Sequence, residues 1–288
     1  MTYHTKRGSY ENGTLVCHWC GMRTAVPKTC PECGSEHLRF AGYGTQRVEQ
    51  DLCELMPDAR VLRMDTDTTA TKHAYGDLLG TFRRHEADVL LGTQMVTKGH
   101  DFPDVTLVGV LLADASLYLD DYRAAERTFA LLTQVIGRAG RADKPGRAVI
   151  QTNNPDHEII NLARKQNYEG FFAREIKIRK ILSFPPFCDI VLMNIVSDNE
   201  GELALACKRL YDDFRARAMK DYDDLPMVVF GPFEAPVYKV DGKYRMRMVI
   251  KCRLNKKSRE LFSILLTEFG RKAKGKTSLS IDFNPTNL

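Results

Sequence analysis

The sequence predicts a two-domain α/β protein in which a lobe with a parallel sheet precedes a smaller α+β domain. Its 288 residues suffice for two typical domains. Between residues 41 and 155, short apolar runs alternate with helical patterns, which is typical of a parallel sheet with helices on both faces. From residue 188 to 288 the expected order is strand, helix, strand, strand, helix, strand, as in ferredoxin-like domains.

The composition is that of a soluble globular protein. With 43% hydrophobic and 27% charged residues, the chain is neither disordered nor fibrous. No apolar run approaches the ~18 residues that a membrane helix needs, and Met1 to Tyr10 lack a secretory signal, so we expect a cytoplasmic protein. A net charge of +5 indicates a mild preference for binding polyanions.

Residues 1–40 contain two Cys-x-x-Cys pairs, which predict a zinc-binding region. The pairs are separated by nine residues and consist of Cys17, Cys20, Cys30 and Cys33. Each pair can direct two thiolates at one metal about 2.3 Å away, and two pairs complete a tetrahedral zinc site. A pair of redox disulfides is the alternative, but no thioredoxin-like strand precedes either pair. His18 and His37 are weaker ligand candidates.

The elements of the lobe follow from apolar periodicity. A first helix opens after Gly44-Thr45 and ends at Pro57, a second carries Ala74 to Phe82, and a longer one runs from about Arg123 to Arg138. The expected strands are Val61 to Met64, Val89 to Leu91, Val105 to Leu112 and Ala148 to Gln151.

A helical linker over residues 156–187 joins the two domains. We expect helices from Asp156 to Gln166 and from Tyr168 to Leu182, closed by the prolines between Phe184 and Phe187. The last domain is expected to contain strands at Asp189 to Ser197, Met227 to Phe230, Lys243 to Arg253 and Ser278 to Phe283, and helices at Glu200 to Lys220 and Lys257 to Arg271.

The most specific chemical pattern is the segment Gln-Val-Ile-Gly-Arg-Ala-Gly-Arg at the end of the long helix. Arg138 and Arg141 are three residues apart and share a helical face. Gly137 and Gly140 leave the surface between them bare, so a phosphate chain can approach the guanidinium groups. A solvated basic helix end is the alternative.

A polar loop follows the strand that ends at Leu91. Thr93, Gln94 and Thr97 and the backbone N–H groups of this loop can hold a nucleic-acid phosphate, and Gly99 permits a tight turn. In parallel sheets, ligands bind at the loops that follow the strands. The loop is therefore a candidate binding site.

These two segments resemble motifs V and VI of superfamily 2 helicases. The cysteine pairs, the segment from Arg63 to Thr69, the segment from Arg123 to Val135 and the Phe-Pro-Pro-Phe break are similar to one branch, the primosomal replication-restart helicases. The resemblance covers nearly the whole chain. It implies a RecA-like second helicase lobe with a zinc-knuckle insertion, followed by a ferredoxin/S10-like C-terminal domain.

The resemblance also implies roles for individual residues. Arg141 corresponds to the arginine finger that reaches the γ-phosphate of ATP, with Arg138 beside it and Gln134 linking the nucleotide and DNA sites. Gly99 and Asp101 would lie at the nucleotide as well. The candidates for DNA phosphate contacts are Thr93, Gln94, Lys98, Thr68 and Thr69. For Thr68 and Thr69, a role as turn residues is equally expected.

The implied activity is that of an ATP-driven 3′ to 5′ DNA helicase that restarts stalled forks and helps assemble the primosome. Its cofactors would be Zn²⁺ and, in the intact protein, ATP and Mg²⁺. Its partners would be branched forks, single-stranded DNA, the acidic tail of single-stranded DNA-binding protein, and helicase-loader and primosome proteins. A non-enzymatic zinc-bearing scaffold and a RecG-like fork helicase are the alternative functions.

Compared with the family pattern, this chain is expected to lack the phosphate-binding G-x-x-x-x-G-K-[ST] loop and the magnesium-binding DEx[HD] segment. We therefore expect no ATP hydrolysis by this chain alone. Family members carry four Cys-x-x-Cys pairs in two zinc sites, and this chain has two pairs. These pairs combine around one ion, leave the knuckles empty or stay disordered.

The strand from Lys243 to Arg253 alternates basic and apolar residues, which predicts a half-buried strand with a basic outer face. Lys243, Arg245 and Arg247 are the candidates on this face for binding DNA or an acidic protein tail; a solvated sheet face is the alternative. The remaining thiols are expected to be buried, at Cys53, Cys188, Cys207 and Cys252.

Overall fold

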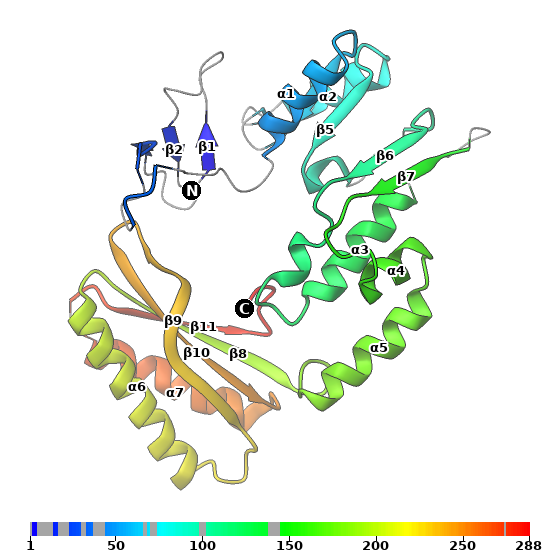
Figure 1. Cartoon of the computed structure of the whole chain (residues 1–288). Helices are drawn as coiled ribbons and strands as arrows, with labels where there is room; N and C mark the ends of the chain where they lie inside the picture. Colours follow the sequence, from blue (N-terminus) through cyan, green and yellow to red (C-terminus); the bar gives the residue numbers. More distant parts are fainter. Residues whose placement is uncertain are drawn as a thin grey trace. The chain divides into compact units, whose positions relative to one another are not determined.

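The computed structural model in Figure 1 describes most of the chain. The described residues are 2–4, 14–16, 23–29, 33–36, 44–65, 68–69, 74–97, 102–137, 145–273 and 275–288. The chain divides into two compact units, and each is described by itself. The first unit comprises Met1–Leu119 and Ala124–Tyr168, and the second comprises Asp120–Arg123 and Glu169–Leu288. Over these ranges, no helix combines the length and the hydropathy that crossing a membrane requires.

Three short strands near the N-terminus form an antiparallel sheet that the sequence pattern did not predict. They are β1 (Thr2–His4), β2 (Thr14–Val16) and β3 (Arg23–Ala25). The pairing runs from β1 through β2 to β3. Strands of three residues contain too few positions for an alternating pattern to be recognised in a sequence.

The lobe contains two pairs of parallel strands. They are β4 (Val61–Met64) with β5 (Val89–Gly92), and β6 (Leu107–Val110) with β7 (Arg147–Ile150). All four strands and their parallel pairing agree with the prediction. In the part of the chain that the structure describes, they form two sheets of two strands instead of one continuous sheet.

Helices surround these strands at the predicted places. The helices of the lobe are α1 (Thr45–Leu55), α2 (Ala74–Arg83), α3 (Ala124–Ile136) and α4 (Glu158–Arg164), with 3₁₀ turns η2 (Gln94–Thr97) and η3 (Ala115–Tyr118). On α3, Ala124, Thr128, Leu132 and Val135 are buried, which is the spacing of one helical face. This face packs the helix against its neighbours β6, β7, η2, η3 and α4.

The linker helices divide between the two units. Helix α4 belongs to the first unit, and α5 (Tyr168–Ile181) lies in the second from Glu169 onward. The His157 side chain caps α4 by accepting a hydrogen bond from the N–H of Ile159 at 3.2 Å.

The C-terminal domain has the predicted order of strands and helices. Its elements are β8 (Asp189–Ser197), α6 (Glu200–Lys220), β9 (Val228–Val240), β10 (Lys243–Cys252), α7 (Lys256–Lys272) and β11 (Ser278–Phe283). The four strands form one antiparallel sheet in the order β11-β8-β10-β9.

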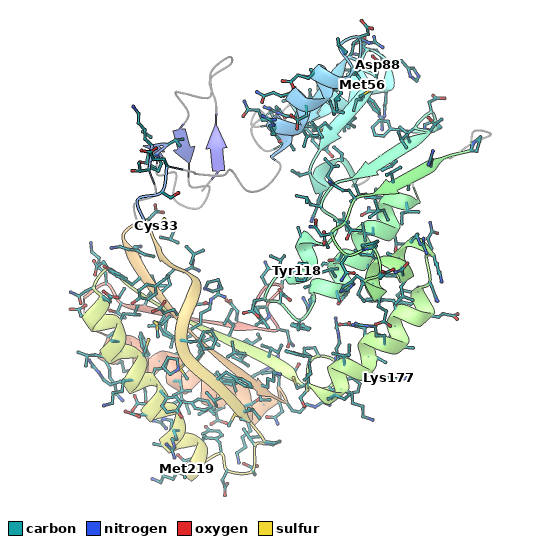
Figure 2. All side chains as sticks on the ribbon, in the orientation of Figure 1. Cys33, Met56, Asp88, Tyr118, Lys177 and Met219 are labelled. Carbon is teal, nitrogen blue, oxygen red and sulfur yellow. The ribbon has the colours of Figure 1, made fainter. Side chains whose placement is uncertain are left out.

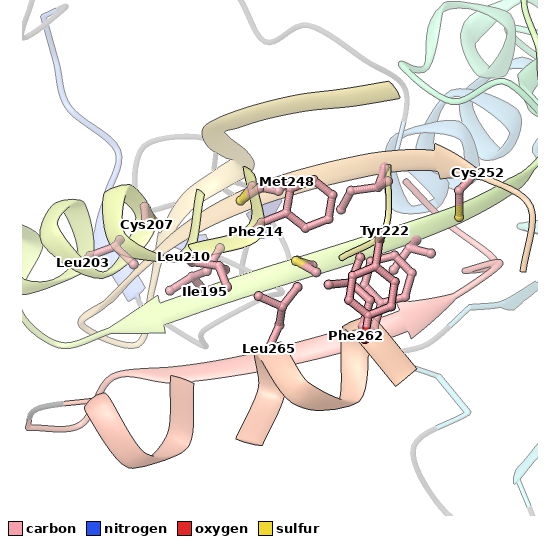
Figure 3. Packing of buried hydrophobic residues seen from close by; sticks show 14 residues of the cluster. Ile195, Leu203, Cys207, Leu210, Phe214, Tyr222, Met248, Cys252, Phe262 and Leu265 are labelled. Carbon is pink, nitrogen blue, oxygen red and sulfur yellow. The ribbon is translucent and has the colours of Figure 1, made fainter. Parts of the chain in front are cut away.

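A hydrophobic core fills the space between this sheet and the two helices (Figure 3). Leu203 and Leu210 of α6 and Phe262 and Leu265 of α7 are almost fully buried in it. Asn255 and Ser258 form a capping box at the start of α7, which satisfies its first N–H groups. Because both helices cover one face of the sheet, the basic residues of β10 belong to the opposite face.

Strand β9 is longer than predicted. We expected a strand from Met227 to Phe230, but it continues through Pro232 and Pro236 to Val240. Proline is tolerated there because β9 is an edge strand of the sheet. The turn to β10 is Asp241-Gly242 with φ of 49° and 75°, and an Asp-Gly turn is a hairpin signal that the sequence analysis did not use.

The prediction of buried thiols was right for two of the four cysteines. Cys207 and Cys252 are buried, and burial raises the pKa of each to about 11. Cys188 is half-buried, and its thiol donates to the carbonyl of Ser183 at 3.0 Å. The prediction was wrong for Cys53, which is exposed because α1 buries none of its side chains completely.

Candidate functional site

Two loops of the lobe meet at the edge where β4 and β5 end. Met64 and Gly92 are register partners at the carboxyl ends of these parallel strands. Thr68 and Thr69 follow β4, and Thr93 and Gln94 follow β5, so both loops leave from the same edge. Ligands bind at this edge in parallel sheets, and the predicted DNA candidates of both loops therefore lie at a suitable place.

Gly92 allows the two strands to end side by side, and the sequence analysis missed it. A Cβ atom at this position would lie 2.4 Å from the carbonyl oxygen of Met64 and 2.5 Å from Cγ1 of Val96. Any side chain would therefore displace the β4 backbone or the η2 turn. The glycine fixes the distance between the strand edge and the polar loop.

Asp65 organises the turn after β4. Its backbone N–H donates to the Thr68 hydroxyl at 2.9 Å. Its carboxylate oxygen Oδ1 accepts a hydrogen bond from the Thr68 N–H, also at 2.9 Å. The Thr69 hydroxyl donates to the Asp65 carbonyl at 2.6 Å. Both hydroxyls that were candidates for DNA contacts are therefore engaged within the turn, as expected for turn residues.

The carboxylate of Asp65 also joins α1 to β4. It also accepts a hydrogen bond from the Thr45 hydroxyl at 2.6 Å and forms an ion pair with the Arg63 guanidinium at 3.0 Å. Arg63 reaches Glu49 of α1 at 2.9 Å as well. Burial opposes ionisation of Asp65, but the hydrogen bonds from Thr45 and Thr68 and the charge of Arg63 lower its pKa below the ordinary value.

The two helicase-like segments adjoin in the structure. The turn η2, which carries Gln94, packs against α3, which carries Gln134. Both glutamines and Thr93 are exposed. Gly137 ends the helix, and its N–H donates to the carbonyl of Thr133 at 3.0 Å. The described parts of the segments that resemble motifs V and VI, at η2 and along α3, are therefore adjacent in the lobe.

Several predicted site residues lie outside the residues that the structure describes. They are Arg138, Arg141, Gly99, Asp101, Lys98, Cys17, Cys20 and Cys30. Of the four predicted zinc ligands, Cys33 alone is described, and its thiol is exposed and free (Figure 2). The fit of these cysteines to zinc stays a prediction.

One segment does match the G-x-x-x-x-G-K-[ST] spacing, so the expectation that this pattern is absent was wrong. It runs from Gly270 to Thr277. A phosphate-binding loop follows a strand and opens a helix, whereas this segment leaves the end of α7 and leads into β11. The Thr277 hydroxyl is hydrogen-bonded to that of Ser197 at 2.9 Å. The order of the elements makes the match a coincidence of sequence.

The face of the C-terminal sheet opposite α6 and α7 combines basic and aromatic residues. Lys243, Arg245 and Arg247 alternate along β10 with residues of the core. Phe233 is the register partner of Arg247 and Phe230 that of Val249, and the two rings are 41% and 44% exposed. Cations beside exposed rings are the groups that bind single-stranded nucleic acids.

Arg247 is the most enclosed of the three basic candidates. Within the described part of the chain, its buried Nε has no hydrogen-bond partner. Burial and then the neighbouring Arg245 lower its pKa. An incoming anion would supply the missing acceptor.

The basic row of β10 has a second function at its other end. Lys251 donates to the carbonyl of Leu182 at 2.8 Å, and Arg253 approaches that of Pro186 at 3.5 Å. These two contacts fix the segment that leads into β8. The candidate surface for ligands is thus limited to Lys243, Arg245 and Arg247.

Comparisons with known proteins find two family models that match this chain. Residues 38–143 match the helicase conserved C-terminal domain, and residues 180–286 match the primosomal protein N C-terminal domain. The replication restart protein PriA of Bacillus subtilis (strain 168) is 43% identical over 286 residues, which are 99% of this chain and 34% of that protein. PriA of Synechocystis is 41% identical over 260 residues, which are 87% of this chain and 30% of the relative. PriA of Treponema pallidum is 35% identical over 288 residues, which are 100% of this chain and 42% of that relative.

The chain therefore contains a helicase C-terminal domain joined to a second α/β domain. It belongs to the PriA family of replication restart proteins and matches the C-terminal part of these proteins. It spans between 30% and 42% of the length of the three relatives.

Proposed function

We propose that the chain forms the second motor lobe and the C-terminal domain of an ATP-dependent 3′ to 5′ DNA helicase. In this proposal the intact protein restarts stalled replication forks and helps assemble the primosome. The packing of η2 against α3 carries the proposal because it brings the described parts of the two helicase-like segments side by side. The names of the relatives support the same function.

In this function, Arg141 is the arginine finger and Arg138 its neighbour, reaching the phosphates of ATP held by a separate lobe. Gln134 is exposed near the end of α3, just before these arginines. Gly99 and Asp101 would complete this wall of the nucleotide site. An arginine finger is typically worth about 10³ to 10⁵ in rate, or roughly 4 to 7 kcal/mol of activation free energy.

The lobe is RecA-like in this proposal, with its polar edge holding DNA. Thr93 and Gln94 are exposed at this edge, and Lys98 follows four residues after Gln94. They would contact phosphates of a single strand without reading its sequence. Thr68 and Thr69 would shape the neighbouring loop, since their hydroxyls are bonded to Asp65.

The C-terminal domain is ferredoxin/S10-like in this proposal and supplies a second DNA surface. Lys243, Arg245 and Arg247 would neutralise phosphates while bases stack on Phe230 and Phe233. The acidic tail of single-stranded DNA-binding protein is an alternative occupant with the same charge. Loader and primosome proteins are the further partners of the intact protein, which would act in the cytoplasm.

Zinc is the proposed structural cofactor, held by Cys17, Cys20, Cys30 and Cys33. Four thiolates complete a closed tetrahedral site, which stabilises a fold without taking part in a reaction. ATP and Mg²⁺ are cofactors of the intact protein. Because the Gly270 to Thr277 segment has the wrong order of elements for a phosphate-binding loop, this chain alone is expected not to hydrolyse ATP.

The test is an exchange of segments. The chain replaces the matching segment of Bacillus subtilis PriA, and DNA-stimulated ATP hydrolysis and 3′ to 5′ unwinding are measured beside those of the chain alone. We expect activity in the chimera and none in the chain. A well-folded chimera that binds DNA without hydrolysing ATP would favour the scaffold function. Activity on RecG-type substrates without primosome assembly would favour the RecG-like alternative.

A further inference from the structure

Four residues of the second unit interrupt the first unit in the sequence. Asp120–Arg123 belong to the second unit, whereas Leu119 before them and Ala124 after them belong to the first. Ala124 is the first residue of α3, the helix that carries Gln134. Any restraint on Tyr122 therefore acts two residues before this helix begins.

Tyr122 is held by a set of contacts within the second unit. Its ring stacks on that of Phe184 with centroids 4.9 Å apart and an interplanar angle of 6°. The guanidinium of Arg179 lies 5.2 Å from the Tyr122 ring centroid, and that of Arg123 lies 5.1 Å away. Burial raises the pKa of the Tyr122 phenol above its ordinary value.

The stack continues to both sides. Arg179 donates to the Glu175 carboxylate at 2.9 Å and to the carbonyl of Pro185 at 3.3 Å, and its side chain is only 14% exposed. On the far side, the Lys251 ammonium lies 3.7 Å from the Phe184 ring centroid and 5.5 Å from that of Phe230. Phe230 belongs to the face of the C-terminal sheet opposite α6 and α7.

We propose that Tyr122 is a positioning residue that fixes the chain immediately before α3. Through Phe184 and Lys251, the stack connects the basic and aromatic face of the sheet to the residue two places before the helix. Aromatic stacking and cation–π contacts depend on ring geometry, so a change at this face reaches Tyr122 through contacts that are all formed together. The significance for ATP hydrolysis rests on the proposed function, but the positioning itself does not.

Hydrogen exchange of the full chain tests the positioning without ATP. In Tyr122→Ala, amides in the first turns of α3 should exchange about tenfold faster, equivalent to about 1.4 kcal/mol, while those of α7 keep their rates. Tyr122→Phe keeps the ring and should exchange like the original chain. Tyr118→Ala is the matched control, since Tyr118 is also close to α3 in sequence but 69% exposed.

A double-mutant cycle separates positioning through the stack from simple loss of packing. Phe184→Ala, which changes a residue distant from α3 in sequence, should accelerate the same α3 amides, and the double variant should add little to Tyr122→Ala alone. Unchanged α3 exchange in Tyr122→Ala, or equal acceleration over the whole chain, would overturn the proposal. Because no nucleotide or DNA is present, such a failure is distinct from inactivity of the PriA chimera.

Discussion

The hydroxyl of Thr45 donates to the carboxylate of Asp65, with Oγ1 and Oδ2 2.6 Å apart. This hydrogen bond joins the first residue of α1 to the residue that follows β4. Arg63 forms an ion pair with the same carboxylate and the Thr68 N–H donates to it, so one largely buried group fixes a helix, a strand end and a turn. The edge that carries the DNA candidates therefore depends on Asp65.

Replacing Asp65 with alanine should destabilise the first unit by about 2 kcal/mol, because Thr45 and Thr68 would lose a charged acceptor in a partly buried place. Chemical denaturation at neutral pH measures this loss. The exposed Asp88, paired with Arg60, is the control, and Asp88→Ala should have a clearly smaller effect. Equal effects of the two substitutions would contradict the role given to Asp65.

The contribution of Asp65 should also depend on pH. Its pKa is lower in the folded than in the unfolded protein, so its stabilisation is complete above the unfolded value of about 3.9. The stabilisation is lost as the pH falls from that value through the folded pKa. The difference in unfolding free energy between the original chain and Asp65→Asn should therefore shrink on acidification below pH 4. A constant difference would be inconsistent with a lowered pKa.

Gly92→Ala should destabilise the lobe by about 2 to 3 kcal/mol, because the new Cβ would lie 2.4 Å from the Met64 carbonyl oxygen. Gly109 on β6 offers a matched control, since a Cβ there would meet no atom within 4 Å. Gly109→Ala should be neutral or stabilising by up to about 1 kcal/mol. Thermal unfolding of both variants measures these changes in stability. An unchanged stability of Gly92→Ala would contradict the prediction, because it would mean that the ends of β4 and β5 move apart without cost.

Lys243→Ala and Arg245→Ala should each weaken binding of single-stranded DNA and lower the slope of log affinity against log salt concentration by about 0.7. Fluorescence anisotropy over a range of salt concentrations measures both quantities. Lys208→Ala is the control because Lys208 is exposed on α6, on the covered side of the sheet. If all three variants lost the same affinity, the binding would reflect net charge and not this face.

Metal analysis of the purified chain should find one zinc ion per molecule, bound by Cys17, Cys20, Cys30 and Cys33. Cys33→Ser should release it, because three remaining thiolates bind zinc less tightly. Cys53→Ser should retain the metal, since the exposed Cys53 belongs to α1. A metal-free chain purified in the presence of zinc would exclude the combined site.

Periodic segments were predicted well from the sequence. Apolar residues recur with the helical period along α3 and α7 and with the strand period along β10. Each of these elements begins within a few residues of its expected start. β9 was underestimated: it contains Pro232 and Pro236, which a strand tolerates at the edge of a sheet, and edge position depends on the folded sheet and not on local sequence.

Candidate site residues could be chosen from the sequence where the pattern that marks them lies within one short segment. Thr93, Gln94 and Gln134 could be chosen from their segments, and strand order explains why the two loops share an edge. Gly92 and the stack of Tyr122 on Phe184 were missed because both depend on atoms distant in sequence. No periodic pattern marks such contacts.

The most direct test of the motor function is the effect of Arg141 on DNA-stimulated ATP hydrolysis by the chimera with Bacillus subtilis PriA. Arg141→Ala should lower kcat by about 10³ to 10⁵ while single-stranded DNA still binds. Arg147→Ala, at an exposed arginine that begins β7, should leave turnover unchanged. Full ATP hydrolysis by the Arg141→Ala chimera would contradict the assignment of this chain as the lobe that supplies the arginine finger.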